Sequence, residues 1–218
     1  WTDMSTSSPK FTRLGEDARR EALIAAALDL MAAGGPGAAT VRAIAEKAGV
    51  TPGLIRHYFN SKGDLTRAAY QAMMATLTAS SIAAPAHAQS GPEARLALFV
   101  AVSLRPPIVD PASLGLWAGF LHQVRHDPQM RAVHETAYLH YRDLLQGLIA
   151  AQPRPAGDAQ LRADAIACNA VIDGLWLEGS ALPHAFDLNE LEQIGLRSVG
   201  AILGLPLASF LPQEPETT

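Results

Sequence analysis

Residues 40–62 read TVRAIAEKAGVTPGLIRHYFNSK. The first part predicts a short helix, because Thr40 is a good N-cap and apolar residues recur behind it at helical spacing. Gly49 is expected to end that helix in the left-handed conformation, which glycine adopts without steric cost. Thr51 then caps a second helix, and Pro52 occupies its first position. Two short helices joined by a tight glycine turn predict a helix-turn-helix.

The second helix has a buried face and an exposed face. Ile55 and Phe59 share one side and are expected to be buried, whereas Gly53, Arg56 and His57 face elsewhere. A recognition helix presents its N-terminal residues to base edges in the major groove of DNA. The missing side chain at Gly53 would let backbone and groove approach closely, and Arg56 could donate two hydrogen bonds to a guanine edge.

The polar residues around this helix are suited to phosphate oxygens, which fix the register of a protein on DNA without reading sequence. Ser61 is expected to cap the following helix, so that Lys62 lies at a helix N-terminus, where free amides also favour phosphate. Helix-turn-helix geometry also occurs in proteins that never contact DNA, so a helical protein without operator binding stays an alternative. The predicted DNA-binding residues are Thr40, Arg42, Thr51, Pro52, Gly53, Arg56, His57, Tyr58 and Lys62.

Residues 19–70 resemble the DNA-binding domain of the TetR/AcrR family of repressors. The matching elements are a first helix, REALIAAALDLM from residue 20, a turn, GGPGAATV from residue 34, the motif IAEKAGVTPG from residue 44, and HYFNSKGDL from residue 57. The sequence departs from the family at Gly37, where an aromatic or aliphatic residue often fills the turn. The resemblance implies a transcriptional regulator that binds double-stranded DNA.

The C-terminal part is similar to one subgroup of that family, the choline-responsive repressors of glycine betaine synthesis. The stretches that carry this similarity are LWAGFL from residue 116, HDPQM from residue 126 and AVIDGLWL from residue 170. The resemblance implies an all-helical domain for ligand binding and dimerisation. It also implies that a small molecule releases the protein from its operator.

Composition agrees with a helical regulator. The chain has 218 residues, of which 49% are hydrophobic, and strand-type alternation is absent, so the predicted fold class is all-α. The net charge of −4 argues against a protein that coats nucleic acid without regard to sequence. Residues 1–65 hold 8 Lys and Arg against 7 Asp and Glu, and residues 66–218 hold 9 against 14. This split fits a protein that contacts DNA through a local patch.

We expect nine helices in two domains. A flexible N-terminus (1–15) precedes the helix-turn-helix domain (16–61), and an effector-binding and dimerisation domain (62–211) precedes a flexible tail (212–218). An Ala- and Pro-rich loop is expected at 83–91, Asp110 is expected to cap one helix, and Asp187 is expected to cap the last helix. Outside the motif, the expected helices cover residues 16–33, 62–82 (the connecting helix), 92–104, 111–125, 128–151, 158–180 and 188–203.

The last two helices are the expected dimer interface. Gly174, Gly179, Gly195 and Gly200 are costly inside helices, so their expected use is close helix approach. The family resemblance implies that this helix pair meets its twofold copy as a four-helix bundle. A dimer is also favoured because one short helix reads only a few base pairs, whereas two copies read a pseudo-palindrome. The predicted interface residues are Val171, Leu175, Gly179, Leu191, Ile194, Arg197, Ser198 and Ile202.

A cavity for the effector is expected between the fifth and eighth helices. Aromatic faces combined with a carboxylate attract organic cations such as choline, because the ring quadrupole draws positive charge. Trp and Phe at helical spacing are more often core residues, and the acidic residues could equally lie on the dimer surface or cap helices. The candidate effector-binding residues are Phe99, Trp117, Phe120, Leu121, His122, Tyr138, Tyr141, Asp173, Trp176 and Glu178.

A metal site is the main competing interpretation for the C-terminal part. His122 and His126 lie four residues apart, so both could face one metal ion. No Cys or HExxH pattern neighbours them, which favours solvent-facing histidines. A helical protein that binds a small molecule or a metal, without DNA, is therefore the alternative function.

Catalysis finds little support in the sequence. Ser80, Ser81, His87 and Asp110 contain the residue types of a hydrolytic triad, but no nucleophile elbow surrounds the serines. We therefore predict that the protein is not an enzyme and carries no cofactor.

Cys168 is the only cysteine, so no disulfide can form within the chain. Its apolar helical surroundings predict a buried, inert thiol rather than a redox sensor. A chain without disulfides fits a reducing cytoplasm, and no apolar run reaches the length of a membrane span. We therefore expect a cytoplasmic protein with no membrane partner.

Overall fold

The computed structural model describes residues 9–87 and 91–210, and every regular element within these ranges is a helix. This confirms the predicted all-α class. The elements are α1 (Pro9–Gly34), α2 (Val41–Lys47), α3 (Pro52–Tyr58), α4 (Lys62–His87), α5 (Pro92–Ser103), α6 (Pro111–Val124), α7 (Pro128–Ala150), α8 (Asp158–Ala181), α9 (Glu190–Leu203) and the short 3₁₀ helix η1 (Leu207–Phe210).

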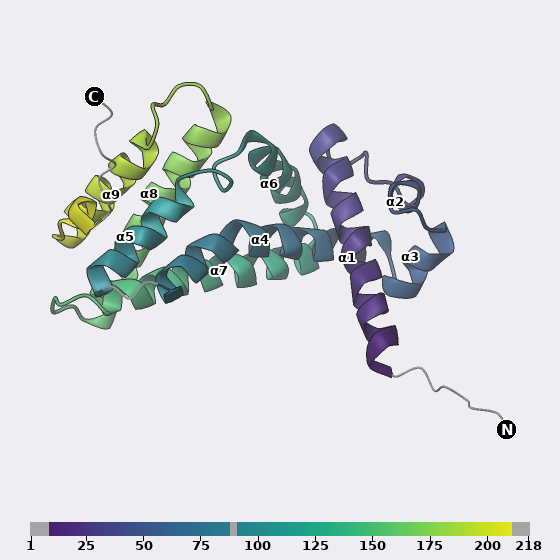
Figure 1. Cartoon of the computed structure of the whole chain (residues 1–218), viewed down its shortest axis with the longest axis horizontal. Helices are drawn as coiled ribbons and strands as arrows, with labels where there is room; N and C mark the ends of the chain where they lie inside the picture. Colours follow the sequence, from purple (N-terminus) through teal and green to yellow (C-terminus); the bar gives the residue numbers. More distant parts are fainter. Residues whose placement is uncertain (1–8, 88–90, 211–218) are drawn as a thin grey trace.

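The helices form two bundles that share two long connecting helices. Figure 1 shows α1, α2 and α3 at one end of an elongated molecule, and α5, α8 and α9 at the other. Between the two ends, α4 and α7 pack against each other, and α6 contacts both α1 and α8. Any movement of α4 or α6 therefore changes packing contacts in both bundles.

Each bundle has its own hydrophobic core. The N-terminal core joins α1, α2, α3 and the first half of α4, and it also takes in one residue each from α6 and α7; its largest members are Leu23, Ile44, Ile55, Phe59, Leu65, Tyr70, Phe120 and Met130. The C-terminal core is built mainly from α5, α7, α8 and α9, with Leu96, Phe99, Leu145, Trp176 and Leu196 among its members. Trp117 of α6 packs against both cores.

Helix starts follow local capping chemistry at several positions. The carboxylate of Asp110 accepts a hydrogen bond from the Ser113 amide at 2.8 Å, and Pro111 occupies the first position of α6. The Ser61 hydroxyl accepts from the Asp64 amide at 3.1 Å at the start of α4. Both caps were expected from the sequence and are confirmed.

Two expectations about where helices begin are wrong. The first helix begins at Pro9, so residues 9–15 are not a flexible terminus; residues 1–8 and the tail at 212–218 lie outside the described part of the chain. Asp187 does not cap α9, because the helix starts after Asn189, which has a positive φ of 62°, and the Asp187 amide instead donates to the Glu190 side chain at 2.9 Å.

The predicted loop at 83–91 is also wrong in its first part, because α4 continues through Pro85 to His87. The carbonyl oxygen of Pro85 accepts a hydrogen bond from Nε of Arg95 at 3.1 Å, and α4 packs along α5. Tertiary packing against α5 thus outweighs the weak helical preference of this stretch.

Among the residues that the structure describes, no helix combines the length and the apolar character needed to cross a bilayer.

Candidate nucleic-acid interface and ligand cavity

The first helix of the motif is built as the sequence predicts. The Thr40 hydroxyl accepts a hydrogen bond from the Ala43 amide at 3.1 Å, and Ile44 and Ala45 are buried. Gly49 has a φ of +66°, so a residue with a side chain would be strained there. The Val50 side chain is half-buried against the N-terminal core, which fixes the angle between α2 and α3.

The second helix of the motif stands on two anchors. Ile55 and Phe59 are buried, and the Arg20 guanidinium lies 5.2 Å from the centre of the Phe59 ring, where the ring attracts the positive charge. Thr51 has the extended backbone of an N-cap residue, but its side chain makes no capping hydrogen bond, contrary to expectation. Its hydroxyl is exposed and is therefore available to an outside partner.

Nothing inside the chain requires glycine at position 53. A Cβ atom built there would come no closer than 3.9 Å to another atom, and the φ of Gly53 is not positive. The residue is exposed at the start of α3. Its missing side chain therefore matters only for an approach from outside the chain.

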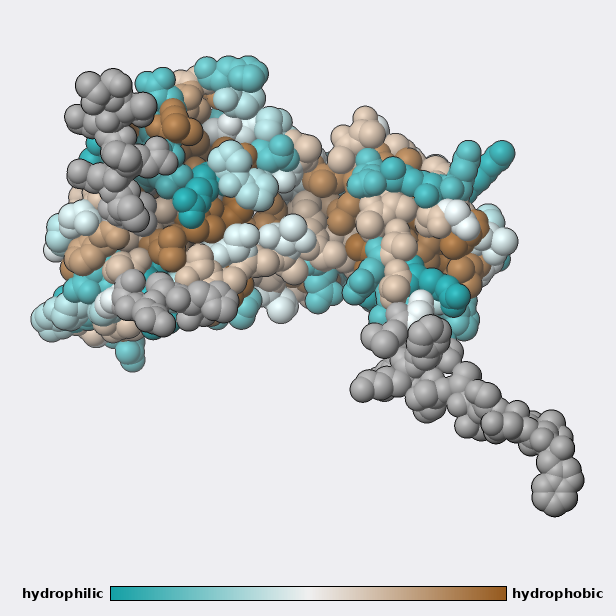
Figure 2. All heavy atoms as spheres, viewed as in Figure 1, coloured by the Kyte–Doolittle hydropathy of each residue, from teal (hydrophilic) through white to brown (hydrophobic). Residues whose placement is uncertain are grey.

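The predicted DNA-binding residues lie on α2, α3, the N-cap positions of these two helices and the start of α4. Only Tyr58 is half-buried, with its ring edge-on to His57 at 5.1 Å. Figure 2 shows hydrophilic side chains gathered around this end of the molecule. The exposed ones are Thr40, Arg42, Thr51, Pro52, Gly53, Arg56, His57 and Lys62.

A charged cluster holds the start of α4 against α7. The Arg67 guanidinium donates to Asp64 at 2.6 Å and to Asp127, the cap of α7, at 2.9 Å. Hydrogen bonds from the Ser61 hydroxyl and from Arg67 lower the pKa of Asp64 below its ordinary value. The N-terminus of α4, which follows α3 directly, is thereby tied to the second bundle.

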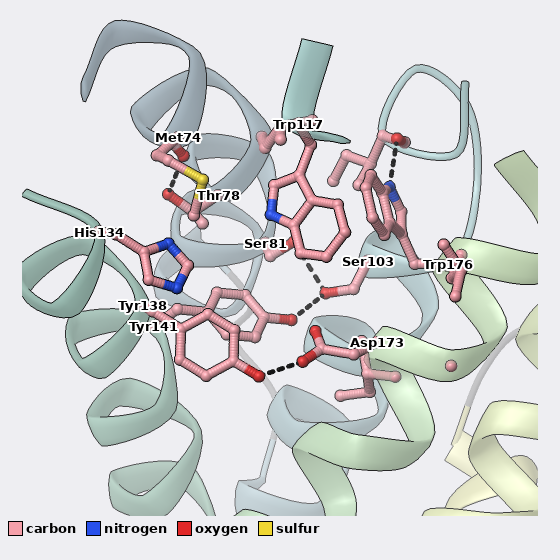
Figure 3. Close-up of a pocket in the computed structure, with 15 residues that line it drawn as sticks. Met74, Thr78, Ser81, Ser103, Trp117, His134, Tyr138, Tyr141, Asp173 and Trp176 are labelled. Carbon is pink, nitrogen blue, oxygen red and sulfur yellow. Dashed lines mark hydrogen bonds between the residues drawn. The ribbon is translucent and has the colours of Figure 1, made fainter. Parts of the chain in front are cut away.

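The second bundle contains a cavity of about 400 Å³ between α4, α5, α6, α7 and α8. This volume lies in the range of sites for small organic ligands. Five predicted effector-binding residues line it: Trp117, Tyr138, Tyr141, Asp173 and Trp176 (Figure 3).

The other five candidates do not line the cavity. Phe99 is buried behind Tyr141, with ring centres 5.0 Å apart, and Phe120 belongs to the N-terminal core. The remaining three are half-buried or exposed elsewhere on their helices: Leu121, His122 and Glu178.

One wall of the cavity escaped the sequence analysis. It comes from the second half of α4 and consists of Met74, Leu77, Thr78 and Ser81, which recur at helical spacing. The small hydroxyl residues Thr78 and Ser81, within an otherwise apolar stripe of α4, were the sequence feature that could have indicated this wall. Ser103, Ile108, His134, Ile172, Gly174 and Leu177 complete the lining.

Among the residues that the structure describes, Asp173 is the only carboxylate that lines the cavity, and its hydrogen-bond partners are neutral. The Tyr138 hydroxyl donates to it, and the Asn169 side-chain amide donates to the same oxygen at 2.8 Å. Within the described residues, no Lys or Arg forms an ion pair with Asp173. Burial raises the pKa of Asp173, and burial together with Asp173 raises the pKa of Tyr138 to about 12.

A second group of hydroxyls lines the same cavity. Ser103 Oγ lies 2.8 Å from Tyr141 Oη and donates to Ser81 Oγ at 2.9 Å. Figure 3 shows the Asp173 carboxylate beside the Tyr138 and Tyr141 hydroxyls, with the Trp117 ring on the far side of the cavity. A ligand would meet one negative group surrounded by aromatic faces and hydroxyls.

The two tryptophans form a rigid apolar corner. Their ring centres are 5.6 Å apart in an edge-to-face arrangement. Trp176 Nε1 donates to the Ile108 carbonyl at 2.9 Å, which fixes its ring orientation.

The described residues of the competing constellations make contacts of their own. The His122 and His126 rings are 5.2 Å apart, but no group of three or more metal-binding side chains occurs within the described residues. Ser81 is hydrogen-bonded to Ser103, and Asp110 caps α6. The side chain of His87 lies outside the described residues.

Cys168 is buried as expected. Burial raises the pKa of its thiol to about 12, so the thiolate that would react is disfavoured.

The predicted interface residues divide between surface and interior. Gly179 and Leu191 are buried against each other inside the chain, and Gly195 and Gly200 also sit at close contacts. Gly174 makes no such contact within the chain. Arg197 and Ile202 are exposed, and the half-buried ones are Val171, Leu175, Ile194 and Ser198.

Comparison with known proteins gives a consistent result. Residues 23–69 match the family described as bacterial regulatory proteins, tetR family, and residues 92–204 match the one described as BetI-type transcriptional repressor, C-terminal. The HTH-type transcriptional regulator BetI of Burkholderia thailandensis is 30% identical over 169 residues, which span 78% of this chain and 85% of that protein. The corresponding protein of Burkholderia mallei is 29% identical over the same shares.

Two solved structures are similar across nearly the whole chain. A putative transcriptional regulator from Pseudomonas aeruginosa PAO1 shares 30% identity with a TM-score of 0.79, covering 93% of this chain and 99% of the other. A putative regulator from Saccharomonospora viridis, solved in complex with choline, has a TM-score of 0.68 at 19% identity, covering 82% and 94% of the two chains. The second likeness shows the fold alone.

Proposed function

Because the chain belongs to the TetR family of transcriptional regulators, with a BetI-type C-terminal domain, we propose that it is a homodimeric repressor that a small organic cation releases from its operator. Family membership confirms the resemblance read from the sequence. The relatives are transcriptional regulators rather than enzymes, as expected.

DNA binding by the exposed face of the motif is supported by how α3 is mounted. Ile55 and Phe59 hold the helix on the N-terminal core, which leaves Arg56, His57 and the N-terminal turn free to enter a groove. Arg56 would read a base edge, and Lys62 would hold a phosphate at the start of α4.

Homodimer formation is supported by the surface of α8 and α9. Ile166 and Ile202 are large apolar side chains that stay exposed on these helices, at 42% and 38% of their area. A twofold partner would cover them and would place two copies of α3 in successive major grooves, about 34–36 Å apart. The operator would then be pseudo-palindromic, and the protein would act in the cytoplasm, where the DNA is.

The observation that carries the effector proposal is Asp173. This carboxylate lies in an aromatic-walled cavity and has only neutral partners. A cation placed there would gain attraction from the carboxylate and from the Trp and Tyr faces. The choline complex of the S. viridis protein makes choline the first ligand to examine.

A thermal-shift titration with choline tests the cavity. We expect choline to raise the melting temperature of the wild type and to have little effect on Asp173→Asn. Glu178→Gln is the matched control, because Glu178 is an exposed carboxylate on the same helix that does not line the cavity. Equal stabilisation of the wild type and Asp173→Asn would contradict a cation held by Asp173.

Selection of bound duplexes from random DNA tests the operator proposal independently. We expect recovery of a pseudo-palindromic sequence, and choline should release the protein from it. Ligand binding without any selected DNA would instead favour the alternative of a helical ligand-binding protein.

A further inference from the structure

Tyr70 connects α4 to the N-terminal core. Its side chain is fully buried, and its ring packs against Phe120 with the ring centres 4.8 Å apart. Leu65, one turn earlier on α4, belongs to the same core, which also anchors α3 through Ile55. A displacement of Tyr70 would therefore act on the support of the recognition helix.

The hydroxyl of Tyr70 contacts a residue that lines the cavity. It is hydrogen-bonded to Nδ1 of His134 on α7 at 2.6 Å, and the two rings are stacked with centres 6.1 Å apart. His134 lines the cavity. Burial lowers the pKa of His134, which favours the neutral ring with one nitrogen free to accept a hydrogen bond.

The contact continues to the carboxylate of the cavity. The His134 ring lies 5.6 Å from the Tyr138 ring, and the Tyr138 hydroxyl donates to Asp173. Figure 3 shows His134, the tyrosines and Asp173 following one another across the cavity. We name these four side chains, Tyr70, His134, Tyr138 and Asp173, the ring path.

A ligand cation at Asp173 would have to alter this path. The cation would compete with the Tyr138 hydroxyl for the Asp173 carboxylate oxygen, or it would push against the Tyr138 and His134 rings. Close-packed rings do not move singly, and a buried hydroxyl such as that of Tyr70 must keep a partner. Tyr70 would follow His134. Helix α4, whose first residue Lys62 is one of the predicted DNA-binding residues, would follow Tyr70.

We propose that the Tyr70–His134 hydrogen bond is the contact through which occupancy of the cavity changes operator affinity. This inference rests on the proposed function, because it specifies how effector and operator exclude each other. Tyr70 and His134 are positioning residues here: neither needs to touch the DNA, and Tyr70 does not line the cavity.

The test separates coupling from binding. Choline affinity is measured by calorimetry for the free protein and for the protein saturated with its selected duplex, and the ratio of the two dissociation constants is the coupling factor. We expect a ratio of about 5–150 in the wild type, the usual range for allosteric proteins. In Tyr70→Phe, the ratio should fall by about fivefold or more, while choline affinity of the free protein changes by less than about threefold.

Two variants serve as controls. Tyr141→Phe removes the same kind of hydroxyl on the Ser103 side of the cavity, so it should alter choline affinity but keep the wild-type coupling factor. His140→Gln changes an exposed histidine of α7 and is compared with His134→Gln, which should lose coupling as Tyr70→Phe does. A Tyr70→Phe coupling factor equal to that of the wild type overturns the inference.

A second measurement needs no ligand. The ring signal of His134, assigned by its loss in His134→Gln, is followed by NMR while the selected duplex is added. Linkage is reciprocal, so DNA binding should shift this signal in the wild type and leave it in place in Tyr70→Phe. A His134 signal that does not move in the wild type, or that moves equally in both proteins, overturns the inference even if choline does not bind. A failure of choline to bind refutes only the proposed cation.

Discussion

Gly119 of α6 lies directly against Pro36, so that a Cβ atom built on Gly119 would be 2.9 Å from Pro36 Cγ. Pro36 belongs to the turn between α1 and α2. Two residues before Gly119 on the same helix, Trp117 lines the ligand cavity. The cavity and the DNA-binding motif are thus joined through α6 as well as through α4, at a contact that leaves no room for a side chain.

The substitution Gly119→Ala should push α6 away from this turn. Gly115→Ala is the matched control, because a Cβ at Gly115 of the same helix meets nothing within 4 Å. We expect Gly115→Ala to raise the free energy of unfolding by about 0.5–1 kcal/mol, the usual gain for alanine in a helix. Gly119→Ala should lose that gain and fall below the wild type by about 1–3 kcal/mol. Urea denaturation of both variants checks this, and equal stabilisation would refute the tight contact.

Gly53→Ala should separate folding from DNA binding. The new methyl group has open space in the free protein, so stability should stay equal or rise by about 0.5–1 kcal/mol. Operator affinity should nevertheless drop, because the methyl group would stand between α3 and the groove. Gly147→Ala, at an equally open helical position of α7, should gain stability without losing affinity. A Gly53→Ala protein with wild-type affinity would show that α3 does not approach the DNA closely there.

Arg56→Ala and Lys62→Ala should weaken operator binding in different ways. Loss of a base-reading arginine is expected to cost about 1–3 kcal/mol and to relax specificity at one base pair. Loss of a phosphate-binding lysine should weaken binding to all duplexes alike and reduce the salt dependence by about one unit of slope. Fluorescence anisotropy over a set of single-base operator variants distinguishes the two. Arg105→Ala, an exposed charge between α5 and α6, should change neither quantity.

Ile202→Glu should convert the dimer into a monomer. The substitution places two negative charges at the proposed twofold interface, where like charges repel. Leu139→Glu is the control, since Leu139 is comparably exposed, at 41%, but lies on α7. Sedimentation velocity at micromolar concentration should show a dimer for the wild type and for Leu139→Glu. A wild-type monomer, or a dimer of Ile202→Glu, would refute this interface.

Choline binding should weaken in acid because of Asp173. Burial raises the pKa of this carboxyl above 3.8, so it takes up a proton at a higher pH than an exposed aspartate and then no longer attracts a cation. Affinity should be level at pH values above that raised pKa and fall as the pH decreases through it. Calorimetric titrations across pH provide the measurement, and a flat profile would place the cation elsewhere.

The same shift has the opposite consequence for the free protein. Because the folded pKa of Asp173 is raised, its contribution to stability is full below the unfolded value near 3.8 and is lost as the pH rises through the folded pKa. Asp173→Asn should therefore gain stability relative to the wild type with increasing pH over this window. Urea denaturation of both proteins at matched pH values measures the difference.

The sequence by itself determined the features that depend on neighbours within about four positions. Thr40, Ser61 and Asp110 cap their helices through hydrogen bonds to amides three residues on, and Gly49 turns the chain by its own backbone freedom. Such contacts form wherever the segment lies, which is why the motif and the all-α class could be predicted. Local reasoning failed at Pro85, where packing of α4 against α5 keeps the chain helical, and it also failed for the expected side-chain caps at Thr51 and Asp187.

Only the tertiary structure decided which residues surround the ligand cavity. Phe99 and Phe120 carry the same aromatic signal as Trp117, yet one supports the cavity from behind and the other belongs to the N-terminal core. The cavity wall from α4 depends on packing between helices, and so does the hydrogen bond between Tyr70 and His134, which joins residues 64 positions apart in the chain. Helical periodicity shows that a face is apolar, but how the helices pack determines whether that face meets a core or an open space.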